Sequence, residues 1–167
     1  MNILILGDIF GPSGRLAIKN NLKEIITKFK IDFTIINGEN AADDGLGLTK
    51  SACEEFFSYG VDVITSGNHI WDKKEIIDYI NQEEKLLRPA NLASGSPGNG
   101  YGIFLTKDKK FRIGVINLMG NIYMKKSENV FEVSKEIKKK IVLKKNFDFL
   151  IVDFHGEITS EKMAIGH

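Results

Sequence analysis

Six side chains that can bind a metal ion or transfer a proton come just after the ends of four apolar segments. The segments are NILIL, FTIIN, VDVITS and FLIVDF, and the residues that follow them are Asp8, Glu39, Asn40, Asn68, His69 and His155. Ligands of open α/β sheets collect at the carboxyl ends of the strands. If the four segments are strands of this kind, we expect the six side chains to meet in one crevice.

The chemistry of these side chains suits a pair of divalent metal ions. Hard ions prefer oxygen ligands, and imidazole suits iron, manganese and zinc. Asp8 and Glu39 bring two carboxylates, Asn40 and Asn68 bring amide oxygens, and His155 brings a ring nitrogen. Against two divalent ions the carboxylates leave a charge of roughly +2, which attracts an anionic phosphate. Glu39 is central in the order of motifs, so we expect it to bridge the ions.

His69 has a different expected role from the five metal ligands. Two ions about 3.5–4 Å apart hold a hydroxide nucleophile, because coordination lowers the pKa of bound water towards ~7. His69 directly follows Asn68, and adjacent side chains usually diverge, so we expect His69 to face the substrate and protonate the leaving oxygen. Each residue alone has an ordinary explanation as a cap, turn or core residue. Their coincidence at four equivalent strand ends favours function.

Composition limits the class of protein. The chain has 167 residues, of which 43% are hydrophobic, and this suits one globular domain over residues 1–167. The 23 basic and 22 acidic residues give no overall case for nucleic-acid or membrane binding. Lone Cys53 excludes an internal disulfide. The start MNILILGD lacks the basic and long apolar segments typical of a signal peptide, and no apolar run is long enough to span a membrane. We therefore expect a cytoplasmic protein.

Apolar segments alternate with amphipathic ones, which predicts an α/β fold. The expected strands cover about 2–6, 33–36, 61–65, 102–106, 111–117 and 149–153. The expected helices cover 14–29, 49–60 with Thr49 as N-cap, 72–81 with Asp72 and Glu75 as a capping box, and 129–145. Residues 88–102 form an irregular loop, and the run TSEKMAIG begins a further helix with Thr159 or Ser160 as its cap. Because that helix has barely begun when the sequence stops, we expect a C-terminal part to be missing.

Seven motifs in order carry a resemblance to a known family. They are GDIFG, NGENAADDGLG, GNHIWD, RPAN, GSPGNG, INLMG and DFHGEITSEK. Together they resemble the YmdB-like branch of the calcineurin-like metallophosphoesterases, over the whole chain from Asn2 to Gly166. The resemblance implies an α-β-β-α sandwich of two sheets flanked by helices, with the C-terminal strands missing here.

The resemblance also implies a function. Members look like cytoplasmic bacterial phosphodiesterases with a dinuclear centre, usually of iron or manganese, that hydrolyse 2′,3′-cyclic nucleotides. It implies metal binding by Asp8, Glu39, Asn40, Asn68 and His155, with Glu39 bridging, and it makes His69 the acid. RNA ends are a further candidate substrate, and homo-oligomerisation stays open.

Two departures from the family pattern bear on activity. The family continues into a Gly-Thr-His-Thr-His segment whose histidines complete the metal shell, and it often has Arg where this chain has Asn121. We therefore expect this chain alone to bind metal weakly and to be poorly active. One alternative is a non-catalytic nucleotide-binding or regulatory protein. Another, a Rossmann-type cofactor enzyme, is disfavoured because Gly7, Gly11 and Gly14 do not form the GxGxxG spacing.

Overall fold

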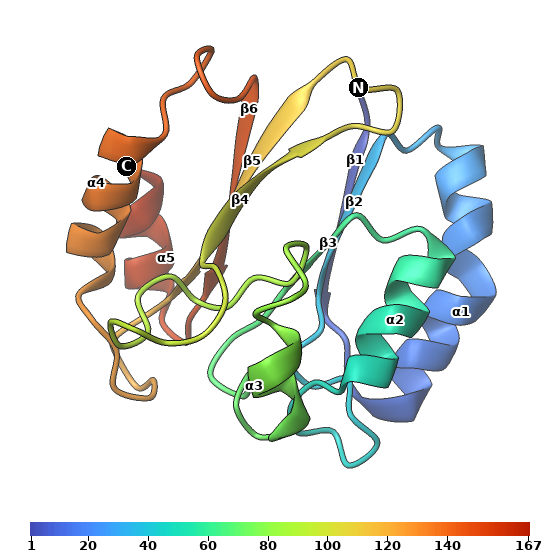
Figure 1. Cartoon of the computed structure of the whole chain (residues 1–167), viewed down its shortest axis with the longest axis horizontal. Coiled ribbons are helices and arrows are strands. Elements are labelled where there is room, and N and C mark those ends of the chain that lie inside the picture. The colour runs from blue at the N-terminus through green and yellow to red at the C-terminus, as the bar shows by residue number, and fades with distance from the viewer.

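Two three-stranded sheets pack face to face in the computed structural model, which describes residues 1–167 (Figure 1). The first sheet is parallel throughout and has the order β1 (Ile3–Asp8), β2 (Phe33–Asn37) and β3 (Val63–Thr65). The second sheet has the order β4 (Tyr101–Leu105), β5 (Arg112–Met119) and β6 (Phe149–His155). In it, β5 pairs antiparallel with β4 and parallel with β6.

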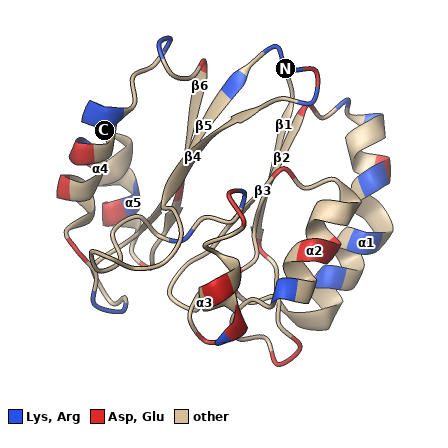
Figure 2. Ribbon diagram, in the orientation of Figure 1, with Lys and Arg blue, Asp and Glu red and all other residues tan.

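Helices cover the outer faces of both sheets. On the side of the first sheet lie α1 (Gly11–Lys28), α2 (Lys50–Tyr59) and α3 (Glu75–Tyr79), and on the side of the second lie α4 (Val130–Lys140) and α5 (Thr159–Gly166) (Figure 1). The ribbons of the two sheets carry few charged residues, and most charges lie on helices and loops (Figure 2). These layers confirm the predicted α/β sandwich flanked by helices.

Alternation along the two central strands builds the core. Successive residues of a strand point to opposite faces of its sheet. Ile35 of β2 and Val115 of β5 belong to the apolar cluster between the sheets. Their neighbours Ile36 and Ile116 belong to two other clusters, which lie beneath α1 and α2 and beneath α4 respectively. Each central strand therefore contributes to two layers of the core, one between the two sheets and one between its own sheet and the helices.

The edge strands are less well covered. On β1, Ile5 is 56% exposed, and on β6, Phe149 and Val152 are 40% and 42% exposed. These side chains would be buried if further polypeptide packed along β1 or β6. None of the helices combines the length and the apolar composition needed to cross a membrane.

Most predicted elements are present, but three helix predictions need correction. Helix α1 begins at Gly11 and not at Gly14, because Pro12 occupies its first turn, where the missing N–H costs nothing. Helix α4 ends at Lys140 and not near Lys145, because Ile141 is already extended at φ −120° and ψ 127°. Helix α5 follows Ile158, which makes no side-chain cap, so the predicted Thr159 or Ser160 cap is wrong.

The predicted capping box at the start of α3 is also wrong. The helix begins only at Glu75, after Lys74, and that position makes no side-chain cap. The Glu75 carboxylate instead accepts a hydrogen bond of 2.8 Å from the backbone N–H of Lys50 at the start of α2. Asp72 is occupied by other contacts, described below. By contrast, Thr49 caps α2 as predicted, since its side chain accepts from the backbone N–H of Ala52.

Candidate metal centre

The carboxyl ends of β1, β2, β3 and β6 carry the predicted site residues. Asp8 and His155 are the last residues of β1 and β6, so they lie within the strands and not after them as predicted. Glu39 and Asn40 lie in the turn after β2. Asn68, with His69, lies in the turn after β3. The parallel directions of these strands bring all four ends to the same side of the sandwich.

The five predicted ligands form one continuous chain of contacts across both sheets. Asn40 Nδ2 donates to Asp8 Oδ2 at 2.8 Å and lies 3.4 Å from Glu39 Oε1. Glu39 Oε1 lies 3.0 Å from His155 Nε2. The same nitrogen lies 3.0 Å from Asn68 Oδ1. Glu39 therefore lies between the Asp8–Asn40 pair and the Asn68–His155 pair.

Burial makes the charges in this chain of contacts matter. Glu39 is only 1% exposed and Asn40 is 9% exposed. Burial opposes protonation of His155, but its hydrogen bond to Glu39 and the charges of Glu39, Asp153 and Asp8 raise the pKa of His155 above its ordinary value. The site thus stabilises positive charge next to its carboxylates.

The arrangement of acceptors fits a bound cation. Asn40 Oδ1 is buried and has no hydrogen-bond partner, which is costly unless another group satisfies it. His155 Nε2 faces two acceptor oxygens, although one N–H normally serves one good acceptor. No three His, Cys, Asp or Glu side chains of the chain lie close enough together to hold a metal ion by themselves, so such a site would also need ligands like the two asparagine amides.

His69 lies beside this chain of contacts but turns toward a different partner. Its Nδ1 lies 2.6 Å from Asp72 Oδ2, and its backbone N–H lies 3.4 Å from Glu39 Oε2. The hydrogen bond with His69 lowers the pKa of Asp72, and Lys125 lowers it further against the effect of burial. Asp72 therefore stays ionised and fixes the ring, with Nε2 directed away from the carboxylate.

Comparison with known proteins identifies the family. A sequence model of the YmdB-like protein family matches residues 4–167. The chain belongs to the YmdB-like family. It is 42% identical, over 99% of its length and 61% of the relative's, to a 2′,3′-cyclic-nucleotide 2′-phosphodiesterase of Bacillus subtilis. The resemblance found in the seven motifs is thereby confirmed.

Solved structures of two longer chains contain the same fold. A hypothetical protein from Thermus thermophilus superimposes with a TM-score of 0.90 at 32% identity, over 100% of this chain and 62% of the other. A novel phosphatase from Mycoplasma pneumoniae gives 0.85 at 38% identity, over 97% and 57%. The YmdB-like chain therefore spans about three fifths of the length of the relatives it matches.

Two residues that contact the candidate site of this YmdB-like chain were not predicted to lie there. Asp72 was assigned to a helix cap, although its spacing of three residues from His69 could have indicated the contact. Lys125, in the loop after β5, donates to the backbone carbonyl of Asn68 at 2.8 Å and lies 3.4 Å from Asp72 Oδ1. No local sequence pattern could have predicted these contacts of Lys125, because both partners lie more than fifty positions earlier in the sequence.

Gly67 allows the close approach of the two halves of the site. A Cβ atom at this position would collide with Glu39 Oε2 and with the ring of His155. Gly67 also immediately precedes Asn68 in the turn after β3. Only glycine lets this turn pass so close to the two proposed ligands.

Buried hydrogen bonds beneath the site hold its turns in place. Asn117 Oδ1 of β5 accepts from the backbone N–H of Ser66 at 3.0 Å, and Ser66 Oγ donates to the carbonyl of Leu87 at 2.8 Å. Asn37 Oδ1 of β2 accepts from the backbone N–H of Glu39 at 3.1 Å. These bonds attach the turns after β2 and β3 to well-buried strands of both sheets.

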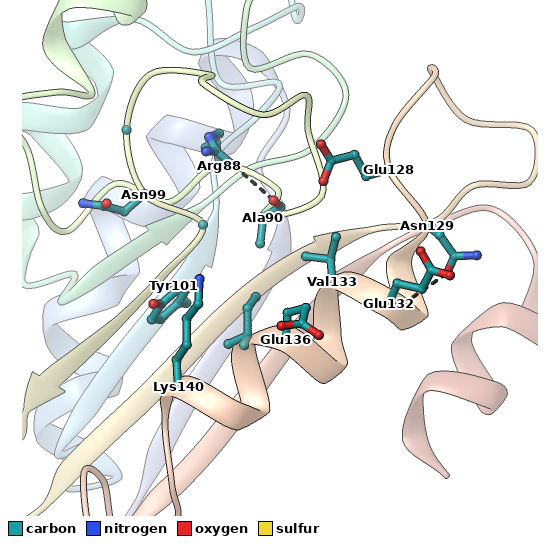
Figure 3. A pocket seen from close by; sticks show the side chains of 13 residues that line it. Arg88, Ala90, Asn99, Tyr101, Glu128, Asn129, Glu132, Val133, Glu136 and Lys140 are labelled. Carbon is teal, nitrogen blue, oxygen red and sulfur yellow. Dashed lines mark hydrogen bonds between the residues drawn. The ribbon is translucent and has the colours of Figure 1, made fainter.

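A separate cavity of about 680 Å³ lies between α4 and the 88–101 segment (Figure 3). None of the six predicted site residues lines it. Arg88 lines the cavity, but its guanidinium donates to the carbonyls of Pro89, Ala90 and Pro97, so its role is to stabilise the loop. The cavity is thus distinct from the candidate metal centre.

Proposed function

We propose that this chain forms the metal-binding part of a phosphodiesterase. The observation that carries the proposal is the continuous chain of contacts from Asp8 to Asn68 and His155, with the unpartnered Asn40 Oδ1 inside it. The name of the Bacillus subtilis relative supports a phosphoesterase, and suggests 2′,3′-cyclic nucleotides as the substrate. RNA ends that carry a cyclic phosphate are a further candidate.

Asp8, Glu39, Asn40, Asn68 and His155 would hold two divalent ions, with Glu39 as the bridge. Iron or manganese is our proposal for their identity, since carboxylate, amide and imidazole ligands together suit both. When bound, such ions supply positive charge for the phosphate and a water nucleophile of lowered pKa. Glu39 suits the bridging role because it contacts both halves of the site.

His69 is the proposed general acid. Asp72 holds Nδ1 of its ring at 2.6 Å, so Nε2 is the nitrogen from which a proton can leave. The His69 side chain is 27% exposed, which leaves it accessible to a bound substrate. Donation from Nε2 to the leaving oxygen avoids the expulsion of a free alkoxide.

A nucleotide-binding protein without catalysis is the second candidate. Only one imidazole, that of His155, takes part in the chain of contacts, and the curated relatives extend well beyond this chain. Fewer protein ligands mean weaker retention of metal. In this case the site would recognise a phosphate without activating water.

One comparison separates the two candidates. We would measure bound iron and manganese and the hydrolysis of 2′,3′-cyclic AMP for the chain and for Asp8→Asn. The phosphodiesterase proposal expects metal-dependent turnover, with metal affinity and activity lowered at least about tenfold in the variant. Tight nucleotide binding with no turnover at any metal concentration would instead establish the binding protein.

A further inference from the structure

We propose that two residues of the 121–126 loop, here called the nucleoside loop, recognise the substrate: Lys125 binds a phosphate oxygen and Tyr123 stacks on the base. The loop connects β5 with α4 and includes the Lys-bearing turn, blue at the lower left of Figure 2. The inference deepens the proposed function and rests on it for the identity of the phosphate. It adds recognition of the nucleobase, which the metal ligands cannot provide.

Lys125 brings a positive charge to the edge of the candidate metal centre. Its ammonium donates to the carbonyl of Asn68, whose side chain contacts His155. An ammonium has three N–H donors, and the contacts with Asn68 and Asp72 use two of them. The Lys125 side chain is 56% exposed, so the third donor is open to an anionic ligand.

The two ends of the nucleoside loop are fixed by buried and local hydrogen bonds. Glu161 of α5 is only 5% exposed, and its carboxylate accepts from the backbone N–H groups of Asn121 and Ile122 at 2.9 and 3.2 Å. Asn121 Nδ2 donates to Ser127 Oγ and to the carbonyl of Glu128, both at 2.9 Å. Asn121 thus ties the two ends of the loop together.

Tyr123 presents an unburied aromatic ring two residues from Lys125. The residue is 86% exposed, although a tyrosine normally buries much of its ring. Its backbone has φ +60°, a left-handed conformation that is unfavourable for a bulky residue. Strain of this kind persists only where the surrounding structure holds it, and it clusters at ligand-binding segments.

The spacing of the two residues suits a nucleotide. Two residues apart, the Cα atoms are at most about 7.6 Å from each other, so the ring and the ammonium can contact one small molecule. An aromatic ring stacks on any base, and a lysine neutralises a phosphate oxygen. If Lys125 had a purely structural role, that role would be its ion pair with Asp72, but exposed ion pairs of this kind contribute little to stability.

Binding of adenosine 3′-monophosphate and of inorganic phosphate, each titrated in Mn²⁺ buffer, tests the proposal. We expect Tyr123→Ala to weaken nucleotide binding about tenfold and to leave phosphate binding unchanged, because stacking acts on the base alone. Tyr123→Phe should restore nucleotide binding. Lys125→Gln should weaken both ligands severalfold, and the neighbouring Lys126→Gln, which keeps the same loop, should weaken neither.

Two results would overturn the proposal. One is an equal loss for both ligands in Tyr123→Ala, which would indicate general damage to the loop. The other is unchanged nucleotide binding in both Tyr123→Ala and Lys125→Gln. Because binding is measured without turnover, the absence of hydrolysis would contradict only the phosphodiesterase. If hydrolysis occurs, Tyr123→Ala should raise KM for 2′,3′-cyclic AMP about tenfold with kcat unchanged.

Discussion

Single atoms decide how the candidate site differs from an ordinary polar turn. A turn residue such as Asn40 usually satisfies both ends of its amide, but here Nδ2 is bound by Asp8 and Oδ1 has no partner. His155 Nε2 faces two oxygens at once. A bound cation needs such an excess of acceptor atoms over donors. The excess arises only when residues from several strand ends meet, so it cannot be inferred from any single position in the sequence.

Substitution of the proposed acid should affect turnover and not metal binding. His69→Asn removes the proton donor while Asp8, Glu39 and Asn68 keep their contacts, so kcat for 2′,3′-cyclic AMP should fall about 10²–10⁴-fold at unchanged metal content. A phosphodiester with a nitrophenolate leaving group needs no protonation, so its loss should be much smaller. Equal losses on both substrates would show that His69 is not the acid.

Substitution of Gly67, which lies close to Glu39 and His155, gives a second test of the site, and Gly7 provides a matched control. In Gly67→Ala the new methyl group overlaps Glu39 and His155, so the chain should lose about 1–3 kcal/mol of unfolding free energy and most of its metal affinity. Gly7→Ala places its Cβ in open space and should change neither. Chemical denaturation and metal titration of both variants measure this, and equal behaviour would contradict the close approach.

Elements were more predictable than the contacts between them. Helix α2 begins after Thr49 and ends at Gly60 as expected. Both signals, a side-chain N-cap and a left-handed glycine at the C-terminus, depend only on neighbouring residues. The helix boundary at Lys140 depends on a turn in which Val142 N–H bonds to Asn146 Oδ1, and no periodicity encodes this. The contact of Lys125 with Asn68 needs both sheets in place, so sequence patterns could not show it.

The start of β5 is tied to the turn before β6 by a pH-sensitive pair. The Asp148 carboxylate accepts hydrogen bonds from Nη2 of Arg112 at 3.1 Å and from the backbone N–H of Arg112 at 2.9 Å. These hydrogen bonds lower the pKa of Asp148 below its ordinary value. A depressed folded-state pKa stabilises the fold fully above the unfolded value, and the stabilisation is lost as the pH falls through the folded value.

Asp148→Asn should therefore destabilise the chain most at neutral pH. The difference in unfolding free energy between the two proteins should shrink below about pH 4, where the wild-type carboxylate becomes protonated. Urea denaturation at several pH values measures this difference. A difference that stays constant down to acidic pH would show that the charge of Asp148 does not stabilise the junction.

At the scale of the whole molecule, the outer side of β6 is one of the regions that leave apolar side chains exposed. Leu150 and Val152 of β6 line an apolar groove of about 340 Å³ together with Ala164 and Ile165 of α5. Exposed edges with apolar side chains pair with other chains unless something covers them. The net charge of +1 adds almost no repulsion between copies. We therefore expect the chain to self-associate in solution.

Val152→Lys should reduce this association, because it places a charge on the exposed edge where another chain would pack. Size-exclusion chromatography over a range of concentrations should show a larger monomer fraction for the variant. Ile77→Lys is the matched control, since Ile77 of α3 is exposed to a similar extent, 39% against 42%, but lies away from the strand edge. If both substitutions change the monomer fraction equally, general surface charge and not the β6 edge governs association.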